Sequence, residues 1–174
     1  DIEAIVGTKG ILTGNDVANR KAGIWIDEGI KAKAIVRPKN TEELSKVLKI
    51  CNEKKQPVVP HGGLTGLAEG AITLEGQIAI STERLNEIET IDTVGRTITL
   101  GAGVQLEKAQ NKAEENNLML AVDLGARGSC TIGGNISTNA GGNMVVKYGM
   151  TRDSVLGLEA VLADGRIVTS LNEM

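Results

Sequence analysis

The fold of this chain depends on the stretch Asp123-Leu-Gly-Ala-Arg-Gly-Ser-Cys-Thr-Ile-Gly-Gly-Asn-Ile-Ser-Thr-Asn-Ala-Gly-Gly142. Its six glycines stand among small hydroxyl and amide side chains. Such residues cannot build a hydrophobic core, but they let bare backbone N–H groups approach a large anionic ligand. A second stretch of this kind, Pro60-His-Gly-Gly-Leu-Thr-Gly66, lies upstream. The presence of two glycine-rich loops in one small chain predicts a single long ligand, with one loop binding each of its ends.

The composition excludes several classes of protein. The 174 residues are 41% hydrophobic, which is enough for one domain of ordinary size or two small lobes. With no Phe, one Trp and one Tyr, the core must be aliphatic, and aromatic platforms for single-stranded nucleic acid are lacking. The net charge is -3 with scattered Lys and Arg, so no nucleic-acid partner is predicted. No apolar run has the length of a membrane span.

Histidine and cysteine are rare in this chain. His61 is the single histidine, and Cys51 and Cys130 lie far apart and fit no metal-binding spacing. We therefore expect no metal site. The two distant cysteines are typical of a reduced environment, which predicts a cytoplasmic protein.

The first part of the chain predicts a small parallel lobe at about residues 1–75. Residues 33–37 are typical of a strand that ends at Pro38, and a helix follows, with Asn40 as its N-cap and Glu43 completing a capping box. One face of this helix is apolar and carries Leu44, Val47, Leu48 and Cys51. Residues 57–60 then predict a buried strand, which makes a βαβ unit. Before it, only a short helix around Ile2, Ile5 and Val6 is indicated.

The remainder, about residues 76–174, predicts a larger and mainly antiparallel lobe with helices. The expected elements are a strand at 77–80, paired strands at 87–92 and 96–101, a helix at 104–116, a strand at 118–122, and a hairpin of 154–163 with 166–170. Asp164-Gly165 indicates a two-residue turn in that hairpin. The predicted fold class is therefore α+β.

The upstream glycine loop has two interpretations. Gly62 and Gly63 allow positive φ angles, successive N–H groups up to Gly66 can surround a phosphate oxygen, and Thr65 adds a hydroxyl donor. The loop is not a Walker P-loop, and no Gly-x-Gly-x-x-Gly stands in the chain. A mobile glycine turn is the alternative, and spacing alone favours neither.

The downstream loop carries more information. Residues 132–142 are small throughout and predict a short helix whose free N-terminal N–H groups favour an anionic or carbonyl-rich ligand. Four polar side chains can bond the edge of a ring system: Ser129, Thr131, Thr138 and Asn139. Close packing of the helix on a sheet explains about half of the glycines, but it does not explain the hydroxyl and amide groups beside them.

Taken in order, these motifs resemble one known family. They are Pro60-x-Gly-Gly-x-Thr-Gly66, Ser81-Thr-x-Arg-Leu-Asn86, Gly101-Ala-Gly103, the run 123–142, Tyr148-Gly149 and the segment 156–165. Together they are similar to the FAD-binding domain of p-cresol methylhydroxylase type. The similarity covers about residues 30–170 and is strongest to the D-2-hydroxyacid dehydrogenases, a group with glycolate oxidase flavin subunits and D-2-hydroxyglutarate dehydrogenases.

The resemblance implies an FAD site between two lobes. The loop at 60–66 would hold the pyrophosphate, and residues of the later loop would line the ribityl and flavin region. The implied cofactor-binding residues are Pro60, His61, Gly62, Gly63, Leu64, Thr65, Gly66, Asp123, Gly125, Ser129, Thr131, Ile132, Gly133, Gly134, Thr138 and Asn139. A D-2-hydroxyacid of the lactate, glycolate or 2-hydroxyglutarate class would give a hydride to the flavin, and a separate acceptor would take the electrons.

The family's proteins are far longer than this chain. The resemblance therefore implies a C-terminally truncated FAD-binding domain without the substrate domain, with no catalytic side chain of its own and no activity alone. Two alternatives remain: a non-catalytic nucleotide- or anion-binding module of the same fold, and a flavin domain like that of UDP-N-acetylenolpyruvoylglucosamine reductase.

Four residues in the loops have competing interpretations. Some relatives attach the flavin through a histidine where this chain has Leu64, so non-covalent FAD is expected. His61 is interpreted as contributing its backbone, with a general base as the alternative. Arg127 either stabilises a reduced flavin or a substrate carboxylate, or it is a solvated surface residue. Cys130 is interpreted as a small loop filler.

Overall fold

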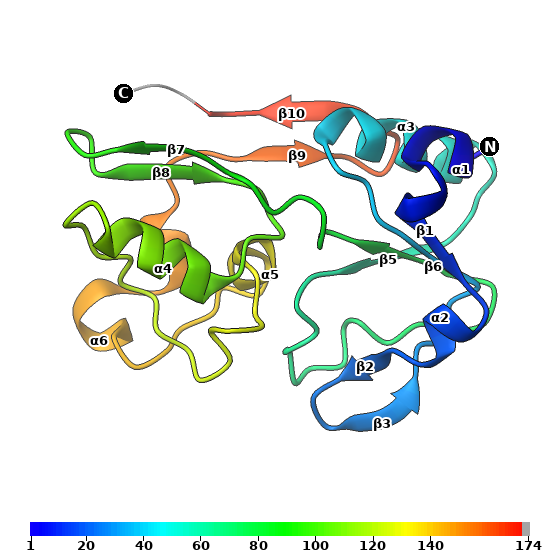
Figure 1. The fold of residues 1–174 in the computed structure, drawn as a ribbon, viewed down its shortest axis with the longest axis horizontal. Helices are drawn as coiled ribbons and strands as arrows, with labels where there is room; N and C mark the ends of the chain where they lie inside the picture. The colour runs from blue at the N-terminus through cyan, green and yellow to red at the C-terminus, as the bar shows by residue number, and fades with distance from the viewer. Residues whose placement is uncertain (172–174) are drawn as a thin grey trace.

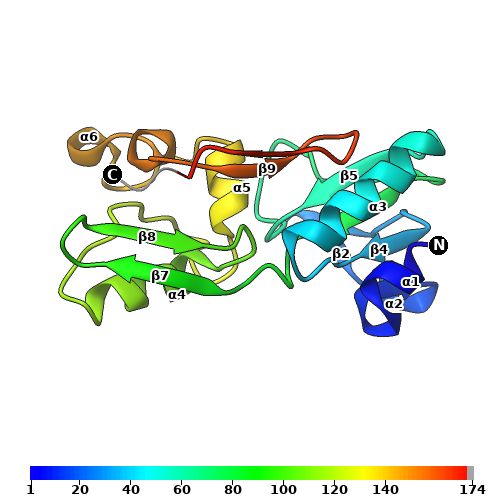
Figure 2. The ribbon, with the colours of Figure 1, turned by 90° about the horizontal axis from the view of Figure 1, so that it is seen from above.

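The computed structural model describes residues 1–171 as two lobes that lie side by side (Figure 1). The first lobe contains the N-terminal half of the chain, and the second begins after strand β6 (Ile78–Ser81). A hairpin of β9 (Glu159–Val161) and β10 (Ile167–Thr169) runs from the second lobe toward the first, as seen from both directions (Figures 1 and 2).

The first lobe is built on a four-stranded sheet with the order β1-β4-β6-β5. Its other strands are β1 (Ile11–Thr13), β4 (Ala34–Val36) and β5 (Val58–His61). Strand β6 pairs in parallel with both β4 and β5, whereas β1 is antiparallel to β4. The predicted βαβ unit is present, but β6 lies between its two strands. The lobe boundary expected near residue 75 is therefore wrong, because the strand assigned to the second lobe forms the centre of the first sheet.

Helix α3 (Thr41–Glu53) connects β4 to β5 and has the predicted cap. The Asn40 side chain accepts a hydrogen bond from the Glu43 N–H at 2.8 Å. The Glu43 carboxylate accepts from the Lys39 N–H at 3.0 Å, one residue before the position a capping box would use. The predicted apolar face of α3 packs against the sheet, and this cluster of aliphatic and sulfur side chains is the largest core of the lobe: Val6, Val36, Val47, Leu48, Cys51, Ile78 and Ile80.

The first thirty residues contain more structure than their sequence indicates. The short helix α1 (Glu3–Val6) was expected; a 3-10 turn (Thr8–Gly10), helix α2 (Asn15–Ala18) and the hairpin of β2 (Lys21–Gly23) and β3 (Ile26–Gly29) were not. The hairpin has an irregular register and carries charged residues. It is nevertheless anchored, because Ala22 and Ile30 are buried in a second core with Val17.

The second lobe is antiparallel, as predicted, but it consists of separate hairpins. Strands β7 (Ile88–Asp92) and β8 (Thr97–Leu100) pair around a turn in which the Asp92 carboxylate accepts from two backbone N–H groups. Helix α4 (Leu106–Glu114) buries its predicted apolar face. Three short helical segments follow: α5 (Ile132–Ser137), α6 (Val145–Tyr148) and a 3-10 turn (Thr151–Ser154).

Two predicted strands of this lobe differ from the structure. Residues 118–122 belong to no strand or sheet within residues 1–171. Strand β9 begins at Glu159 rather than at 154, because residue 154 ends a 3-10 turn and residues 155–158 belong to no strand. Five residues, 162–166, separate β9 from β10, rather than the two predicted. The Leu162 N–H donates to the Arg166 carbonyl at 2.8 Å within this loop, and Gly165 has a φ of 87°.

The β9–β10 hairpin is fixed to helix α3 of the first lobe. The Ser45 hydroxyl donates to the Gly165 carbonyl at 2.5 Å, and the Thr41 hydroxyl donates to the Glu159 carboxylate at 2.5 Å. Val161 packs against the core under α3. The last strands of the chain therefore hold its two lobes together.

Replacing Asn40 by Ala should lower the free energy of unfolding by about 1 kcal/mol, because the Glu43 N–H loses its side-chain acceptor. Asn52→Ala is the matched control, since Asn52 is exposed on the same helix and its side chain bonds no residue among 1–171. Urea unfolding followed by circular dichroism measures both variants. Equal losses in the two variants would show that the cap contributes nothing.

Candidate functional site

The two glycine loops meet backbone to backbone. We call residues 62–66, which follow β5, the first loop, and residues 123–142 the second loop. A Cβ atom on Gly63 would lie 2.0 Å from the Ser129 carbonyl oxygen, and one on Gly62 would lie 2.7 Å from the Thr131 hydroxyl oxygen. Side chains cannot occupy these positions. The glycines are therefore required for close approach, whereas the positive φ angle in the first loop is taken by Leu64, at 54°.

The backbone N–H groups of the first loop have no partners. From Gly62 to Gly66, none donates a hydrogen bond to any of residues 1–171. At the start of the loop, the His61 carbonyl accepts from the Thr82 N–H at 2.9 Å, which fixes its base to the next segment. A run of free N–H groups around a reversal of φ forms a concave donor surface that suits an anion.

Two cavities flank the first loop and share Gly63, Leu64 and Ser129 in their walls. The hairpin cavity, of about 580 Å³, is lined by Lys21, Gly23 and Ile24 of the β2–β3 hairpin and also by Thr65, Gly125 and Ala126. The linker cavity, of about 420 Å³, is lined by Glu83 and Asn86 of the segment after β6, by Thr131, and by Gly62, Gly103, Val104, Gln105 and Lys108. Both volumes suit parts of a small-molecule ligand.

A buried hydroxyl in the linker cavity lacks a partner. Thr131 is 6% exposed, and its Oγ1 makes no hydrogen bond to residues 1–171. A buried polar atom without a partner is costly, so it marks a position where a ligand or water is expected to bond. With the free N–H groups beside it, Thr131 gives the site a set of polar contacts that remain available to a ligand.

The start of helix α5 is not free, contrary to the prediction. The N–H groups of Ile132 and Gly133 donate to the Val104 and Ala102 carbonyls at 2.9 and 2.8 Å. A Cβ on Gly133 would also lie 2.7 Å from the Cβ of Ala102. Close packing therefore explains Gly133, and Ile132 packs in the core of the second lobe. Gly134 lies beside Gly62 at the contact of the two loops.

Other predicted site residues bond within the protein. The Thr138 hydroxyl donates to the Gly134 carbonyl at 2.9 Å, and the Asn139 side chain accepts from the Arg152 N–H at 3.1 Å. Neither residue lines the two cavities. Asp123 also lies outside them: its carboxylate accepts from Arg127 at 3.1 Å, and Arg127 extends further to Glu107 at 3.7 Å. Arg127 is thus a half-exposed, ion-paired surface residue.

His61 is buried beneath the first loop, with Pro60 before it in β5. It is 2% exposed, and its Nε2 lies 2.8 Å from the Ala71 carbonyl, so this nitrogen carries the proton. Burial lowers the pKa of His61, with a further contribution from the positive charge of Arg20. The ring lines neither cavity. These contacts favour an anchoring role over that of a general base.

Cys130 is buried in the core of the second lobe with Leu106 and Val122. Burial raises the pKa of its thiol, which opposes the reactive thiolate form. The position agrees with the interpretation of Cys130 as a filler.

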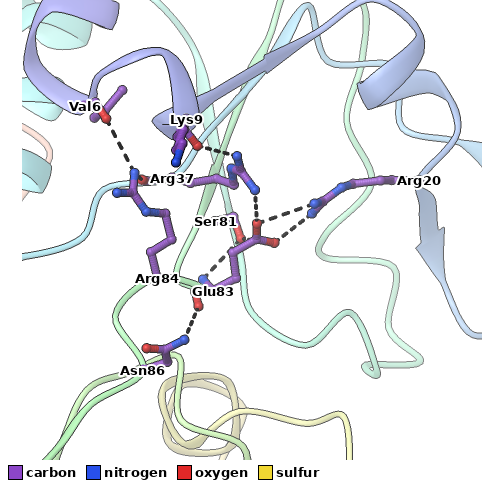
Figure 3. A network of polar contacts seen from close by, with 8 residues as sticks. All are labelled: Val6, Lys9, Arg20, Arg37, Ser81, Glu83, Arg84 and Asn86. Atoms are coloured by element: carbon purple, nitrogen blue, oxygen red, sulfur yellow. Dashed lines mark hydrogen bonds and ion pairs between the residues drawn. The ribbon is translucent and has the colours of Figure 1, made fainter.

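A charge cluster that the sequence did not reveal holds the segment after β6, residues 82–86, which we call the linker. Figure 3 shows Arg20 and Arg37 converging on the Glu83 carboxylate. The hydrogen bond from each arginine to this carboxylate is 2.7 Å long. Burial alone would raise the pKa of Glu83, but hydrogen bonds and charge from Arg20 and Arg37 outweigh it and lower the pKa. The Glu83 carbonyl accepts from the Asn86 side chain at 3.0 Å. The cluster therefore fixes one wall of the linker cavity.

Residues 32–170 match the protein family described as FAD binding domain. A mitochondrial D-2-hydroxyglutarate dehydrogenase from Danio rerio is 44% identical over 137 residues, which is 79% of this chain and 26% of that protein. A D-2-hydroxyglutarate dehydrogenase from Xanthomonas citri pv. viticola is 45% identical over 141 residues, 81% of this chain and 30% of that protein. The chain thus spans less than a third of the length of these relatives.

Solved structures share the fold. p-Cresol methylhydroxylase with bound substrate superimposes with a TM-score of 0.80 at 24% identity, over 97% of this chain and 33% of that one. Alkyldihydroxyacetonephosphate synthase gives 0.87 at 16% identity, over 97% and 36%. Within residues 1–171, no helix is both long and apolar enough to cross a membrane.

Gly63→Ala should lower the free energy of unfolding by about 1–3 kcal/mol, because the new methyl group would overlap the Ser129 carbonyl. Gly66→Ala is the matched control in the same loop: a Cβ on Gly66 would meet no atom within 4 Å, so a change of less than about 0.5 kcal/mol is expected. Chemical denaturation distinguishes the two variants. Equal stability would contradict the contact between the loops.

Acidification should destabilise the chain through His61. Its folded pKa lies below the ordinary value of 6.5, so the unfolded state binds a proton more readily, and stability is lost as the pH falls below that value. His61→Gln keeps a donor for Ala71 but cannot titrate. Between about pH 7.5 and about pH 5, the wild-type chain should lose more unfolding free energy than this variant. Parallel pH curves for the two proteins would disprove the assignment.

Proposed function

Because the chain belongs to the FAD binding domain family of p-cresol methylhydroxylase type, we propose that it is the FAD-binding part of an oxidoreductase acting on D-2-hydroxyacids. The observation that carries this proposal is the first loop, whose five N–H groups from Gly62 to Gly66 are unpaired within residues 1–171 and lie between two cavities. A dinucleotide has a negatively charged centre and a ring system at each end, which fits this arrangement.

The residues present fit FAD. The N–H groups of the first loop would hold the diphosphate, and the unpartnered Thr131 hydroxyl would bond the cofactor in the linker cavity. Ser129 stands in the walls of both cavities and would orient the cofactor between them. When bound, FAD supplies the redox chemistry by taking a hydride from C2 of the hydroxyacid, and a separate acceptor takes the electrons.

The cofactor is proposed to bind without a covalent bond. Leu64 offers no nucleophile, and the His61 ring is buried and bonded to the Ala71 carbonyl. Binding then depends on hydrogen bonds from backbone N–H groups and on the shape of the two cavities. FAD is therefore expected to be released when the chain unfolds.

The substrate class follows from the relatives. Both dehydrogenases described above are named for D-2-hydroxyglutarate, so we propose this acid as the substrate of the whole protein, with lactate and glycolate as the alternatives that the sequence left open. The two cavities flank only a cofactor loop, and the relatives are more than three times longer than the matched region. We therefore assign substrate binding and catalytic side chains to a further domain, without which residues 1–174 would not turn over.

We also propose that the protein works in a reduced compartment. The name of the Danio rerio relative places that protein in mitochondria, whereas the name of the bacterial relative states no organelle. Two free, buried cysteines accord with a reduced compartment such as the cytoplasm.

Titration of the chain with FAD tests the proposal. We expect one FAD per chain, a shifted visible flavin spectrum, and complete release of FAD on denaturation. FMN and ADP should bind more weakly, because each fills only one part of the site. Tight binding of ADP without uptake of any flavin would instead support a non-catalytic nucleotide-binding module.

Thr131→Val is the informative variant for this titration. Removing an unpaired buried hydroxyl should leave the stability of the chain unchanged or raise it, while the affinity for FAD falls about tenfold. Thr90→Val, at an exposed position on β7, serves as the control and should change neither quantity. A loss of stability in Thr131→Val would show that the hydroxyl has a structural partner.

A further inference from the structure

The β2–β3 hairpin brings a cation to the site that the glycine loops do not contain. Lys21, the first residue of β2, lines the hairpin cavity together with Gly63, Leu64 and Thr65. The hairpin is anchored by Ala22, the next residue, which is buried in the core of the first lobe. Packing of Ala22 therefore holds the backbone beside Lys21 in place.

The two cavities differ in charge. Among residues 1–171, Lys21 is the only charged residue in the wall of the hairpin cavity. The linker cavity contains Lys108 and Glu83, and the Glu83 carboxylate is already paired with Arg20 and Arg37. The Lys108 ammonium also donates to the Asn86 carbonyl at 3.1 Å, so it already has a partner. In the hairpin cavity, Lys21 is therefore the cation that an anion held by the shared loop would meet.

Lys21 can take a new partner at little cost. Its ammonium pairs with Asp27 across the hairpin at 2.9 Å, and the two side chains are 63% and 99% exposed. Ion pairs of this exposure contribute little to stability, because water solvates both charges. Asp27 does not line the cavity, so a ligand anion can share or replace it without leaving a buried charge unpaired.

We propose that Lys21 binds the diphosphate anion of the nucleotide cofactor, together with the N–H groups of Gly63, Leu64 and Thr65. This inference rests on the proposed function and adds a residue to it. Lysine suits the task because its ammonium is a point charge that phosphate oxygens approach from many directions. The loop supplies directed hydrogen bonds, and Lys21 supplies the compensating charge.

The test compares Lys21→Met with two matched variants. Lys31→Met removes a similar cation at the foot of the same hairpin, paired with Glu28 at 2.6 Å and 55% exposed, but outside both cavities. Lys108→Met removes the cation of the linker cavity. The probes are inorganic pyrophosphate, ADP and riboflavin, measured by calorimetry and by amide NMR shifts of residues 62–66.

We expect pyrophosphate and ADP to shift the amides of the first loop in the wild-type chain. Lys21→Met should weaken both about tenfold, the usual effect of losing one charge-assisted bond, and should reduce the dependence on salt. Riboflavin, which has no phosphate, should bind equally well to both proteins. Lys31→Met should stay within about twofold of wild type, and Lys108→Met should weaken both probes less than Lys21→Met does.

Three outcomes would overturn the proposal: a tenfold loss in Lys108→Met but not in Lys21→Met, an equal loss for riboflavin, or no shift of the loop amides by pyrophosphate in the wild-type chain. Binding of pyrophosphate that depends on Lys21, without any uptake of FAD, would support the anion site and refute the flavin function. The two proposals can therefore fail separately.

Discussion

The structure depends on one constraint: two backbone segments from different lobes touch where no side chain can stand between them. Gly63 lies against the Ser129 carbonyl, and the same device recurs nearby. A Cβ on Gly103 would lie 1.9 Å from the Thr82 carbonyl, and one on Gly101 would lie 2.3 Å from the Leu85 carbonyl. Glycines thus allow the second lobe to contact the backbone of the linker as well as that of the first loop. The cavities exist because the lobes are held this close without being filled by side chains.

The charge cluster at Glu83 and the glycine contacts both hold the linker in place. The cluster connects it to the first lobe, and the glycines connect it to the second. Arg20 and Arg37 hold the Glu83 side chain toward the first lobe, while the backbone of the linker receives the glycines of the second. A carboxylate that is partly buried requires such partners, because desolvation alone would favour its protonated form. The linker is therefore a rigid part of the site and not a flexible connection.

Features encoded locally could be predicted from the sequence, and features that depend on distant partners could not. Helix α3 and its cap follow from a periodic apolar face and from Asn40, and the glycine runs indicated both loops. The central place of β6 is invisible in a local pattern, because any short apolar strand could occupy it. Glu83 binds arginines 63 and 46 residues away, so nothing near it in sequence marks the cluster. The start of α5 differs from the prediction because the acceptors of its N–H groups are carbonyls of residues 102 and 104, which lie far from it in sequence.

The attachment of the β9–β10 hairpin to α3 has a consequence for biosynthesis. Ser45 and Gly165 are joined although 120 residues separate them, so closing this contact carries the entropy cost of a long loop. During translation, the surface of α3 that contacts the β9–β10 hairpin stays exposed to water until the ribosome has synthesised that hairpin. Nascent chains that end before residue 165 would leave this contact surface of α3 exposed to chaperones and to one another, whereas chains that extend beyond the hairpin would cover it.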